Sequence, residues 1–354
     1  RQVMGPIEPV TGSGGNWWGS QWEGMQKNLA IDTNLTGAFN AWGRKHDVVF
    51  GLDHVRYYSS DAQDYPSSRF GDERLTDIFN PVAPAEPSWD PSTFPSTQII
   101  NVRKTGFYGS LRLRPIENWS VIAGGRYVLR DKTHMDQTYY GPRDSTISKD
   151  ENVFVPYAGL IYDITSDLNV YASAAQIYQS QATYLSGPAP GTPLDPTRGT
   201  NFELGSKWQV AKDLLASVAL YRVEKKGMAV ADTNYSSFTG DGNSFCCYVR
   251  DGYQLSQGID LEINGALTPQ WQFSSGYTYN DNVDKRKSDA RFSALTPRHL
   301  FKLWTDYRFN GTLTGLHLGG GVIVQSSYYS AGAVNLYNPA TGFYDGESNQ
   351  THPT

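Results

Sequence analysis

Polar and apolar residues alternate along much of the chain with a period of two. The stretch 271–280, WQFSSGYTYN, places Trp271 and Tyr277 on one face and small polar residues on the other. Residues two apart share a face of an extended strand, whereas a helix repeats about every 3.6 residues. The pattern therefore predicts β-strands with one apolar and one polar face. The same alternation is clear in three further segments: 28–42, 107–114 and 259–267.

About twelve alternating segments follow one another, and we find no convincing helical segment between them. Many reach about ten residues or more, beyond the roughly five or six of a usual soluble strand. Without crossover helices, a parallel sheet is not expected. The segments are approximately 27–42, 47–60, 98–114, 119–131, 153–163, 168–177, 200–208, 214–229, 253–266, 271–281, 297–309 and 316–328.

The connections between these segments alternate between short and long. This rhythm predicts up-and-down antiparallel hairpins with every long loop at one end, as in outer-membrane barrels. A soluble Greek-key sandwich mixes its connection lengths. We therefore predict an all-β fold, a transmembrane antiparallel up-and-down β-barrel. The short connections are 43–46, 115–118, 164–167, 209–213, 267–270 and 310–315, and the long ones are 61–97, 132–152, 178–199, 230–252 and 282–296.

Composition agrees with strands and limits the other classes of protein. The 354 residues include 23 Tyr and 35 Gly, and charged residues are only 18%. Mean hydropathy is -0.49, and no apolar run approaches the roughly 18 residues of a membrane helix. A membrane barrel needs only alternate apolar residues. The net charge of -5 and the absence of a basic stripe give no support to a nucleic-acid partner.

Catalytic and metal-binding patterns are weak. The 6 His residues show no metal-ligand spacing, and no phosphate loop or serine nucleophile elbow is present. Asp260 and Glu262 share a face about 6.6 Å apart, a spacing that could suit two carboxylates for glycoside hydrolysis. We favour ion pairing with Arg or Lys of neighbouring strands, so we do not expect an enzyme or a protein-bound cofactor.

The 2 cysteines are neighbours, Cys246 and Cys247. Adjacent cysteines lack the spacing of a zinc finger. They form either a strained vicinal disulfide, in an oxidising compartment, or a pair of thiols. The pattern does not indicate a catalytic role.

The long connections are rich in aromatic residues. Such residues reduce solubility unless they bind a ligand or pack together. We therefore predict an aromatic vestibule for a bulky, partly apolar ligand, with loop packing as the alternative. Flat Trp rings would cover the ligand, and Tyr hydroxyls would donate hydrogen bonds. The predicted ligand-binding residues are Trp17, Trp18, Trp22, Tyr140, Tyr178, Tyr235 and Phe245.

Four blocks resemble the barrel of TonB-dependent ferric siderophore receptors, nearest to the ferric coprogen, rhodotorulic acid and pyoverdine receptor group. They stand in the family's order and at its spacing within 156–309. The blocks are PYAGLIYDITSDLNVYASAAQIYQSQ (156–181), LDPTRGTNFELGSKWQ (194–209), SQGIDLEINGALTPQWQFSSGYTYN (256–280) and TPRHLFKLWTDYRF (296–309). The segment 27–131 fits the same barrel by pattern alone.

The resemblance implies an outer-membrane receptor of Gram-negative bacteria that takes up a ferric siderophore, with no resident cofactor. It implies a hydroxamate-type siderophore as ligand, TonB-ExbB-ExbD as energy-coupling partner, and surrounding lipid and lipopolysaccharide. The family has a plug inside a barrel of about 22 strands. The plug, its TonB box and the remaining strands are therefore expected outside residues 1–354. Strands are expected over about 25–330, with 1–24 and 329–354 as outer loops.

The chain departs from the family pattern in one of these blocks. Family members tend to carry an aromatic residue after YAS and Pro-Gln at the next loop, where this sequence has Ala174 and Ser180-Gln181. The departure concerns the shape of that loop. The alternative function is a β-rich carbohydrate-binding or carbohydrate-importing outer-membrane protein, because loop Trp and Tyr residues also stack on sugars. A soluble sugar-binding module and a barrel hydrolase are weaker alternatives.

Overall fold

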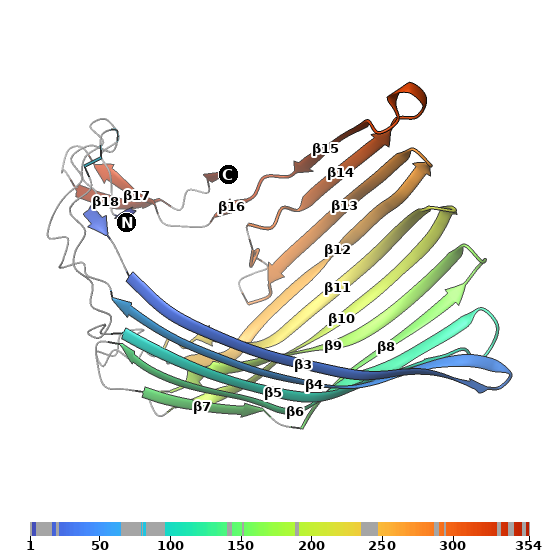
Figure 1. Cartoon of the computed structure of the whole chain (residues 1–354). Helices are drawn as coiled ribbons and strands as arrows, with labels where there is room; N and C mark the ends of the chain where they lie inside the picture. Colours follow the sequence, from blue (N-terminus) through green and yellow to red (C-terminus); the bar gives the residue numbers. More distant parts are fainter. Residues whose placement is uncertain are drawn as a thin grey trace.

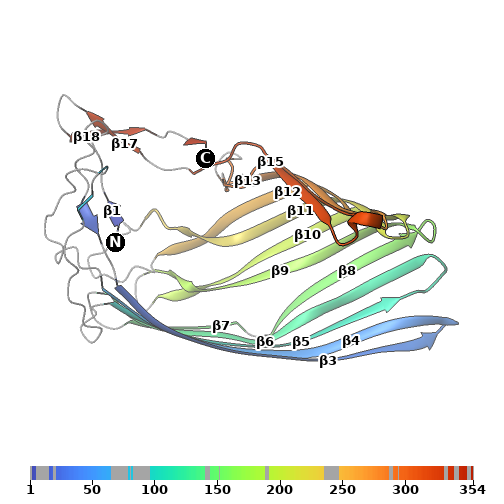
Figure 2. The same cartoon turned by 45° about the horizontal axis from the view of Figure 1, so that its top comes forward.

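The computed structural model describes residues 2–4, 16–18, 21–64, 79, 81–82, 96–139, 144–150, 152–187, 191–234, 247–286, 290–293, 295–330, 334–338, 343–348 and 352–353. These residues form one large antiparallel sheet of 13 strands and three small two-stranded sheets. The large sheet curves into an open trough, with β3 at one edge and β15 at the other (Figure 1 and Figure 2). Strands that follow one another in sequence lie side by side in the sheet and pair with each other, as the hairpin rhythm predicts.

Twelve strands form the continuous path of the sheet, and β7 pairs beside them with β6. Their order is up and down without a crossover between distant segments. The strands are β3 (Gln21–Ala41), β4 (Arg44–Asp64), β5 (Ser96–Leu113), β6 (Trp119–Tyr139), β7 (Asp144–Asp150), β8 (Val153–Asp163), β9 (Leu168–Ser186), β10 (Thr192–Ala211), β11 (Leu214–Ala231), β12 (Tyr248–Thr268), β13 (Trp271–Asp284), β14 (His299–Arg308) and β15 (His317–Gln325).

All twelve predicted strands are present, but several extend into segments expected as loops. β6 continues to Tyr139 and β9 to Ser186, and β7 lies inside the predicted loop 132–152. The loop assignment of these segments is wrong. Beyond the apolar band both faces of a strand meet polar surroundings, so the alternation fades although neighbouring strands still satisfy the backbone hydrogen bonds.

Short turns gather at one end of the sheet and long connections at the other (Figure 1). The turn between β3 and β4 consists of Trp42 and Gly43, both with positive φ, 51° and 71°. Such a two-residue turn matches the twist of the flanking strands. His46 lies beneath it, with no exposed surface. Its Nδ1 accepts a hydrogen bond from the Arg114 backbone N–H, so its Nε2–H donates to the Ala41 carbonyl.

The sheet has one face rich in apolar residues and one rich in polar residues. The register places Phe50, Gly109 and Gly125 in one cross-strand row on the apolar face. Asp53 lies on the opposite face, where it pairs with Arg126. In a transmembrane barrel the apolar face meets lipid and the polar face lines the lumen. We call these the outer face and the inner face.

Aromatic residues mark the short-turn end of the outer face. Trp119 lies opposite Tyr162, with ring centroids 4.7 Å apart, and Trp271 lies opposite Tyr307. Trp208 belongs to the same face at the end of β10. Trp and Tyr collect at membrane interfaces because their rings are apolar and their tips are polar. Trp271 thus lies on the outer face among the aromatic residues of the short-turn end, where a barrel is expected to carry an aromatic girdle.

The remaining elements are short. A 3-10 turn, η2 (Gly311–Leu313), lies between β14 and β15. The small sheets pair β1 (Gln2–Met4) with β2 (Asn16–Trp18), β16 (Tyr329–Ser330) with β19 (His352–Pro353), and β17 (Val334–Asn338) with β18 (Phe343–Ser348). In the part of the chain that the structure describes, no helix has the length and apolarity to cross a membrane.

Candidate functional site

The long-connection end of the inner face is the place where the predicted ligand-binding residues can be examined. Trp22 lies near the start of β3, within a strand rather than in the predicted loop. Its register partner is Gln63, and it shares its face with Asp32 and Asp53 farther along the hairpin. Trp22 is 67% exposed. Its ring is therefore exposed on the inner face of the described sheet, at the long-connection end.

The structure describes the remaining predicted aromatic residues of the loops only in part. Trp17 and Trp18 belong to β2, which pairs with β1, and their side chains lie outside the description. Tyr140, Tyr235 and Phe245 lie outside the described residues. Cys247 is disulfide-bonded, and Cys246, the only other cysteine of the sequence, is not among the described residues. The ligand-binding role of these aromatic residues stays a prediction.

Tyr178 has a hydrogen-bonding role in the structure. It lies in β9, and its hydroxyl donates to Asp131 at 3.3 Å and Asp150 at 3.0 Å. Asp131 is 3% exposed and also pairs with Lys104, at 3.2 Å. The guanidinium of Arg198 lies 5.6 Å from the Tyr178 ring centre. The hydroxyl thus ties β9 to β6 and β7, which leaves it less free for a ligand than predicted.

Gln181 holds three strands together at the same end of the sheet. It is 4% exposed. Its amide nitrogen donates to the carbonyls of Asp195 and Gly227, both at 2.7 Å, and its amide oxygen accepts from the Ala229 N–H. β9 and β10 shift register beside it, between Leu194 and Thr197. The side chain therefore replaces ladder hydrogen bonds that these irregular strands cannot form.

A charged cluster lies on the inner face of β3–β6. Arg126 binds Asp53 in a bidentate geometry, with Nε–Oδ1 and Nη2–Oδ2 distances of 2.9 and 2.5 Å. Asp32 lies directly opposite Asp53, and it accepts a hydrogen bond of 2.8 Å from the Tyr108 hydroxyl. One arginine and one tyrosine thus compensate two facing carboxylates. Sequence spacing gave no sign of this cluster, because its members come from four different strands.

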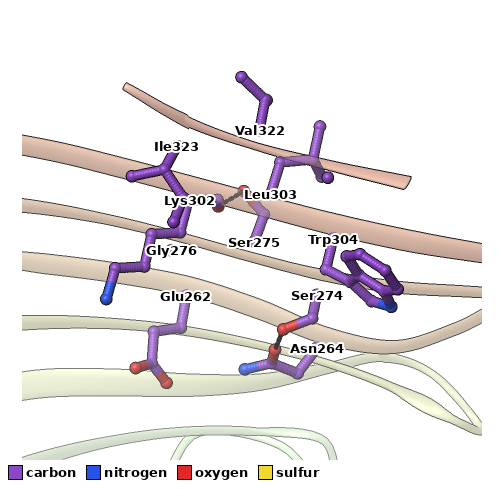
Figure 3. A pocket seen from close by; sticks show the side chains of 11 residues that line it. Glu262, Asn264, Ser274, Ser275, Gly276, Lys302, Leu303, Trp304, Val322 and Ile323 are labelled. Atoms are coloured by element: carbon purple, nitrogen blue, oxygen red, sulfur yellow. Dashed lines mark hydrogen bonds between the residues drawn. The ribbon is translucent and has the colours of Figure 1, made fainter. Parts of the chain in front are cut away.

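A pocket of about 550 Å³ spans β12–β15 (Figure 3). Glu262, Gly276 and Lys302 lie in one cross-strand row of the inner face. In the next row Ser274 donates to Asn264 at 2.6 Å, and Trp304 covers the backbone of Gly321. Sequence reasoning did not select Lys302 or Trp304, although the small residues of GGG (319–321) could have indicated a close approach. The pocket combines charge, amide and an exposed indole ring.

The metal-ligand patterns and the carboxylate pair of the sequence can be compared with the described residues. They contain no group of three or more His, Cys, Asp and Glu side chains that could hold a metal ion. Asp260 and Glu262 share the inner face, but the residues directly opposite Glu262 are Ser217 and Gly276. Ala219 and Thr278 face Asp260. The predicted ion pairing with neighbouring strands is therefore wrong, because those neighbours are uncharged.

Comparison with known proteins identifies the family to which the chain belongs. Residues 6–351 match the family of TonB dependent receptor-like β-barrels. The chain is 30% identical over 335 residues to a ferric-pyoverdine receptor of Pseudomonas putida, covering 92% of the chain and 39% of that receptor. It is 28% identical to the ferripyoverdine receptor of Pseudomonas aeruginosa, over 85% of the chain and 35% of the relative.

Solved structures agree with the sequence comparison. The crystal structure of the Pseudomonas aeruginosa ferripyoverdine receptor bound to ferripyoverdine superposes with a TM-score of 0.77 at 25% identity, over 97% of this chain and 43% of that one. The chain thus spans less than half the length of these relatives. Receptors of this kind transport ligands and are not enzymes, and they lie in the outer membrane of Gram-negative bacteria. The chain belongs to the TonB-dependent receptor-like β-barrel family.

Proposed function

We propose that the chain is part of the wall of a receptor that binds a ferric siderophore and imports it into the periplasm with TonB-coupled energy. The observation that carries this proposal is the 30% identity to a ferric-pyoverdine receptor over 92% of the chain. Family membership supports the transport class. The relatives also support a siderophore of the pyoverdine or hydroxamate type, because they include ferric-pyoverdine receptors and a ferrichrome transporter of Escherichia coli.

The architecture supports capture at the long-connection end. The inner face carries fixed charges and amides, such as Arg126 and Gln181, that suit a polar lumen. Trp22 presents an exposed ring at the mouth, and we assign Trp17 and Trp18 to the same ligand-facing layer. β15 runs towards this end, so we place the residues that precede β3 and those that follow β15 with the outer loops. The siderophore itself chelates the iron, so protein metal ligands are not required.

The test is a titration of the intact receptor in detergent. Tryptophan fluorescence is followed against a panel of ferric and iron-free siderophores that includes pyoverdines, ferrichrome and catecholates. We expect saturable quenching by one ferric hydroxamate or pyoverdine at sub-micromolar concentration. No response across the whole panel would contradict the proposal and would favour a carbohydrate or another chelate as cargo.

Trp22→Ala tests the site within the same titration. Loss of one aromatic contact is expected to weaken binding of the ferric siderophore about fivefold to tenfold. Trp208→Ala is the matched control, because Trp208 lies on the outer face at the short-turn end and is expected to leave the affinity unchanged. Unchanged affinity in Trp22→Ala would remove Trp22 from the site.

A further inference from the structure

A second, smaller pocket of about 360 Å³ opens at the long-connection end of β9–β13. It belongs to the inner face, because Lys225 of β11 lines it and alternates in phase with Ser217, which lies opposite Glu262. It shares no lining residue with the pocket on β12–β15. We call it the side pocket. The lining residues that matter here are Gln179, Gln181, Tyr184, Lys225, Gln254 and Asp284.

The ammonium group of Lys225 has no counter-charge among the described residues. Lys225 is half-buried, and its Nζ donates one hydrogen bond, of 3.0 Å, to the neutral side-chain oxygen of Gln179. It forms no ion pair with another described residue. Withdrawing a charge from water is unfavourable unless an opposite charge or further hydrogen bonds compensate it. The side pocket therefore favours an anionic group from outside the sheet.

The carboxylate of Asp284 also lines the side pocket, but it does not neutralise Lys225. Gln254 lies between the two residues in one cross-strand row, so their backbones are about 10 Å apart. Asp284 Oδ1 instead accepts a hydrogen bond of 3.0 Å from the Arg286 backbone N–H. The Arg286 guanidinium is paired with Asp251, at 2.8 Å. The rim of the pocket is thus internally paired, whereas Lys225 in its wall is not.

Several hydrogen-bond donors converge beside Lys225. Gly199 is its register partner on β10, and the missing side chain there leaves room for Lys225 to reach Gln179 on β9. Gln254 lies directly opposite Lys225 on β12, with side chains about 5 Å apart. The amide groups of Gln179 and Gln254 donate no hydrogen bond to another described residue. An ammonium has three N–H donors and an amide two, so this set matches the two acceptor oxygens of a carboxylate.

The walls around these donors are fixed in place. Gln181 lines the side pocket with its amide held by three backbone groups. Tyr184 packs edge-on against Tyr248, with ring centroids 4.8 Å apart, and is 39% exposed. Its ring offers an apolar surface to the carbon chain that carries an acid group. A preformed site of this kind loses little conformational entropy on binding.

We propose that the side pocket binds a free carboxylate of the ferric siderophore, on a part of the molecule that does not chelate iron. Lys225 is the counter-charge, and Gln179 and Gln254 complete the hydrogen bonds. A volume of about 360 Å³ is at the small end of ligand sites, so the pocket takes one arm of the siderophore and not the whole chelate. The inference rests on the proposed function and narrows it to an acidic siderophore.

The test extends the fluorescence titration of the intact receptor in detergent. The probes are the ferric siderophore that quenches best in the panel and its derivative with every carboxyl group outside the chelate converted to a methylamide. They are compared in wild type, Lys225→Met, Lys225→Arg and the control Lys207→Met. Lys207 lies on the same face but near the short-turn end of β10, 5.7 Å from the ring centre of Tyr171. Heat-modifiable migration in gels confirms that each variant is folded.

Wild type is expected to bind the methylamide about tenfold more weakly than the acid, because a charge-assisted hydrogen bond is lost. Lys225→Met should bind the acid about tenfold more weakly than wild type does, and should bind acid and methylamide equally. Lys225→Arg keeps the charge and should stay within about threefold of wild type. Lys207→Met should leave both affinities unchanged.

The outcomes separate the side pocket from the proposed function. Wild-type affinity for the acid in Lys225→Met would overturn the site. Equal binding of acid and methylamide by wild type, or ferrichrome (which has no free carboxylate) as the best ligand, would overturn the carboxylate assignment while the receptor function stands. No response to any siderophore of the panel would overturn the proposed function and this inference together.

Discussion

Arg126→Met is expected to destabilise the barrel wall, because its guanidinium is the counter-charge of Asp53, a carboxylate that faces a second carboxylate. Arg126 binds Asp53 through two hydrogen bonds, and Asp32 lies opposite Asp53 on the neighbouring strand. Methionine keeps much of the side-chain volume but removes the charge and both donors. Asp53 is only 18% exposed. After the substitution its carboxylate faces Asp32 without a counter-charge.

The size of the effect follows from the geometry. A hydrogen bond to a charged group contributes about 1.5–3 kcal/mol, and removing one partner of a fully buried ion pair costs about 3–5 kcal/mol. The Arg126 side chain is 37% exposed, so water screens part of the interaction. We therefore expect the free energy of unfolding to fall by about 2–3 kcal/mol. Arg222→Gln, at an exposed pair with Glu224, should cost less than about 1 kcal/mol.

The assay is urea unfolding of the intact receptor in detergent, with tryptophan fluorescence as the readout. It is applied to the variants of a double-mutant cycle. The cycle comprises Arg126→Met, Asp53→Asn and the two combined. We expect a coupling energy of about 1–2 kcal/mol, because the double variant removes the unpaired carboxylate that the first variant leaves. A loss below about 0.5 kcal/mol in Arg126→Met, or strictly additive effects in the cycle, would refute this account.

Two further predictions concern the stability of the sheet. Gln181→Leu should lower the free energy of unfolding by about 2–4 kcal/mol, because three backbone groups lose the hydrogen bonds of a buried amide; unchanged hydrogen exchange in β9–β11 would contradict this. Gly124→Val should reduce the yield of folded, heat-modifiable receptor, because a Cβ there would clash with the Gly109 carbonyl oxygen. Gly320→Ala, where nothing lies within 4 Å, is the control and should fold normally.

The fold could be predicted because lipid and lumen impose opposite polarity on alternate residues. Within the apolar band, as in 107–113 of β5, the alternation marks both the strand and its faces. Beyond the apolar band, alternate residues no longer need opposite polarity. The sequence of β7 and of the end of β9 therefore shows no alternation from which a strand could be predicted. Antiparallel pairing with neighbours, which no local pattern encodes, extends these strands.

The interactions that define the site could be predicted less well. Arg126 and Asp53 are 73 residues apart in sequence, so their contact depends on the register of three consecutive strands. The loop aromatic residues were easier to select by composition, but composition does not place a ring against a ligand. Tyr178 illustrates this, because its hydroxyl binds two carboxylates of the wall.

The most direct test of the central claim is uptake of radioactive iron by cells that carry the intact gene as their only receptor for the siderophore identified in the titration. The account predicts saturable uptake of the ferric siderophore that disappears when either the gene or TonB is deleted. Equal uptake without TonB, or without the gene, would contradict the assignment of this barrel wall to a TonB-coupled siderophore importer.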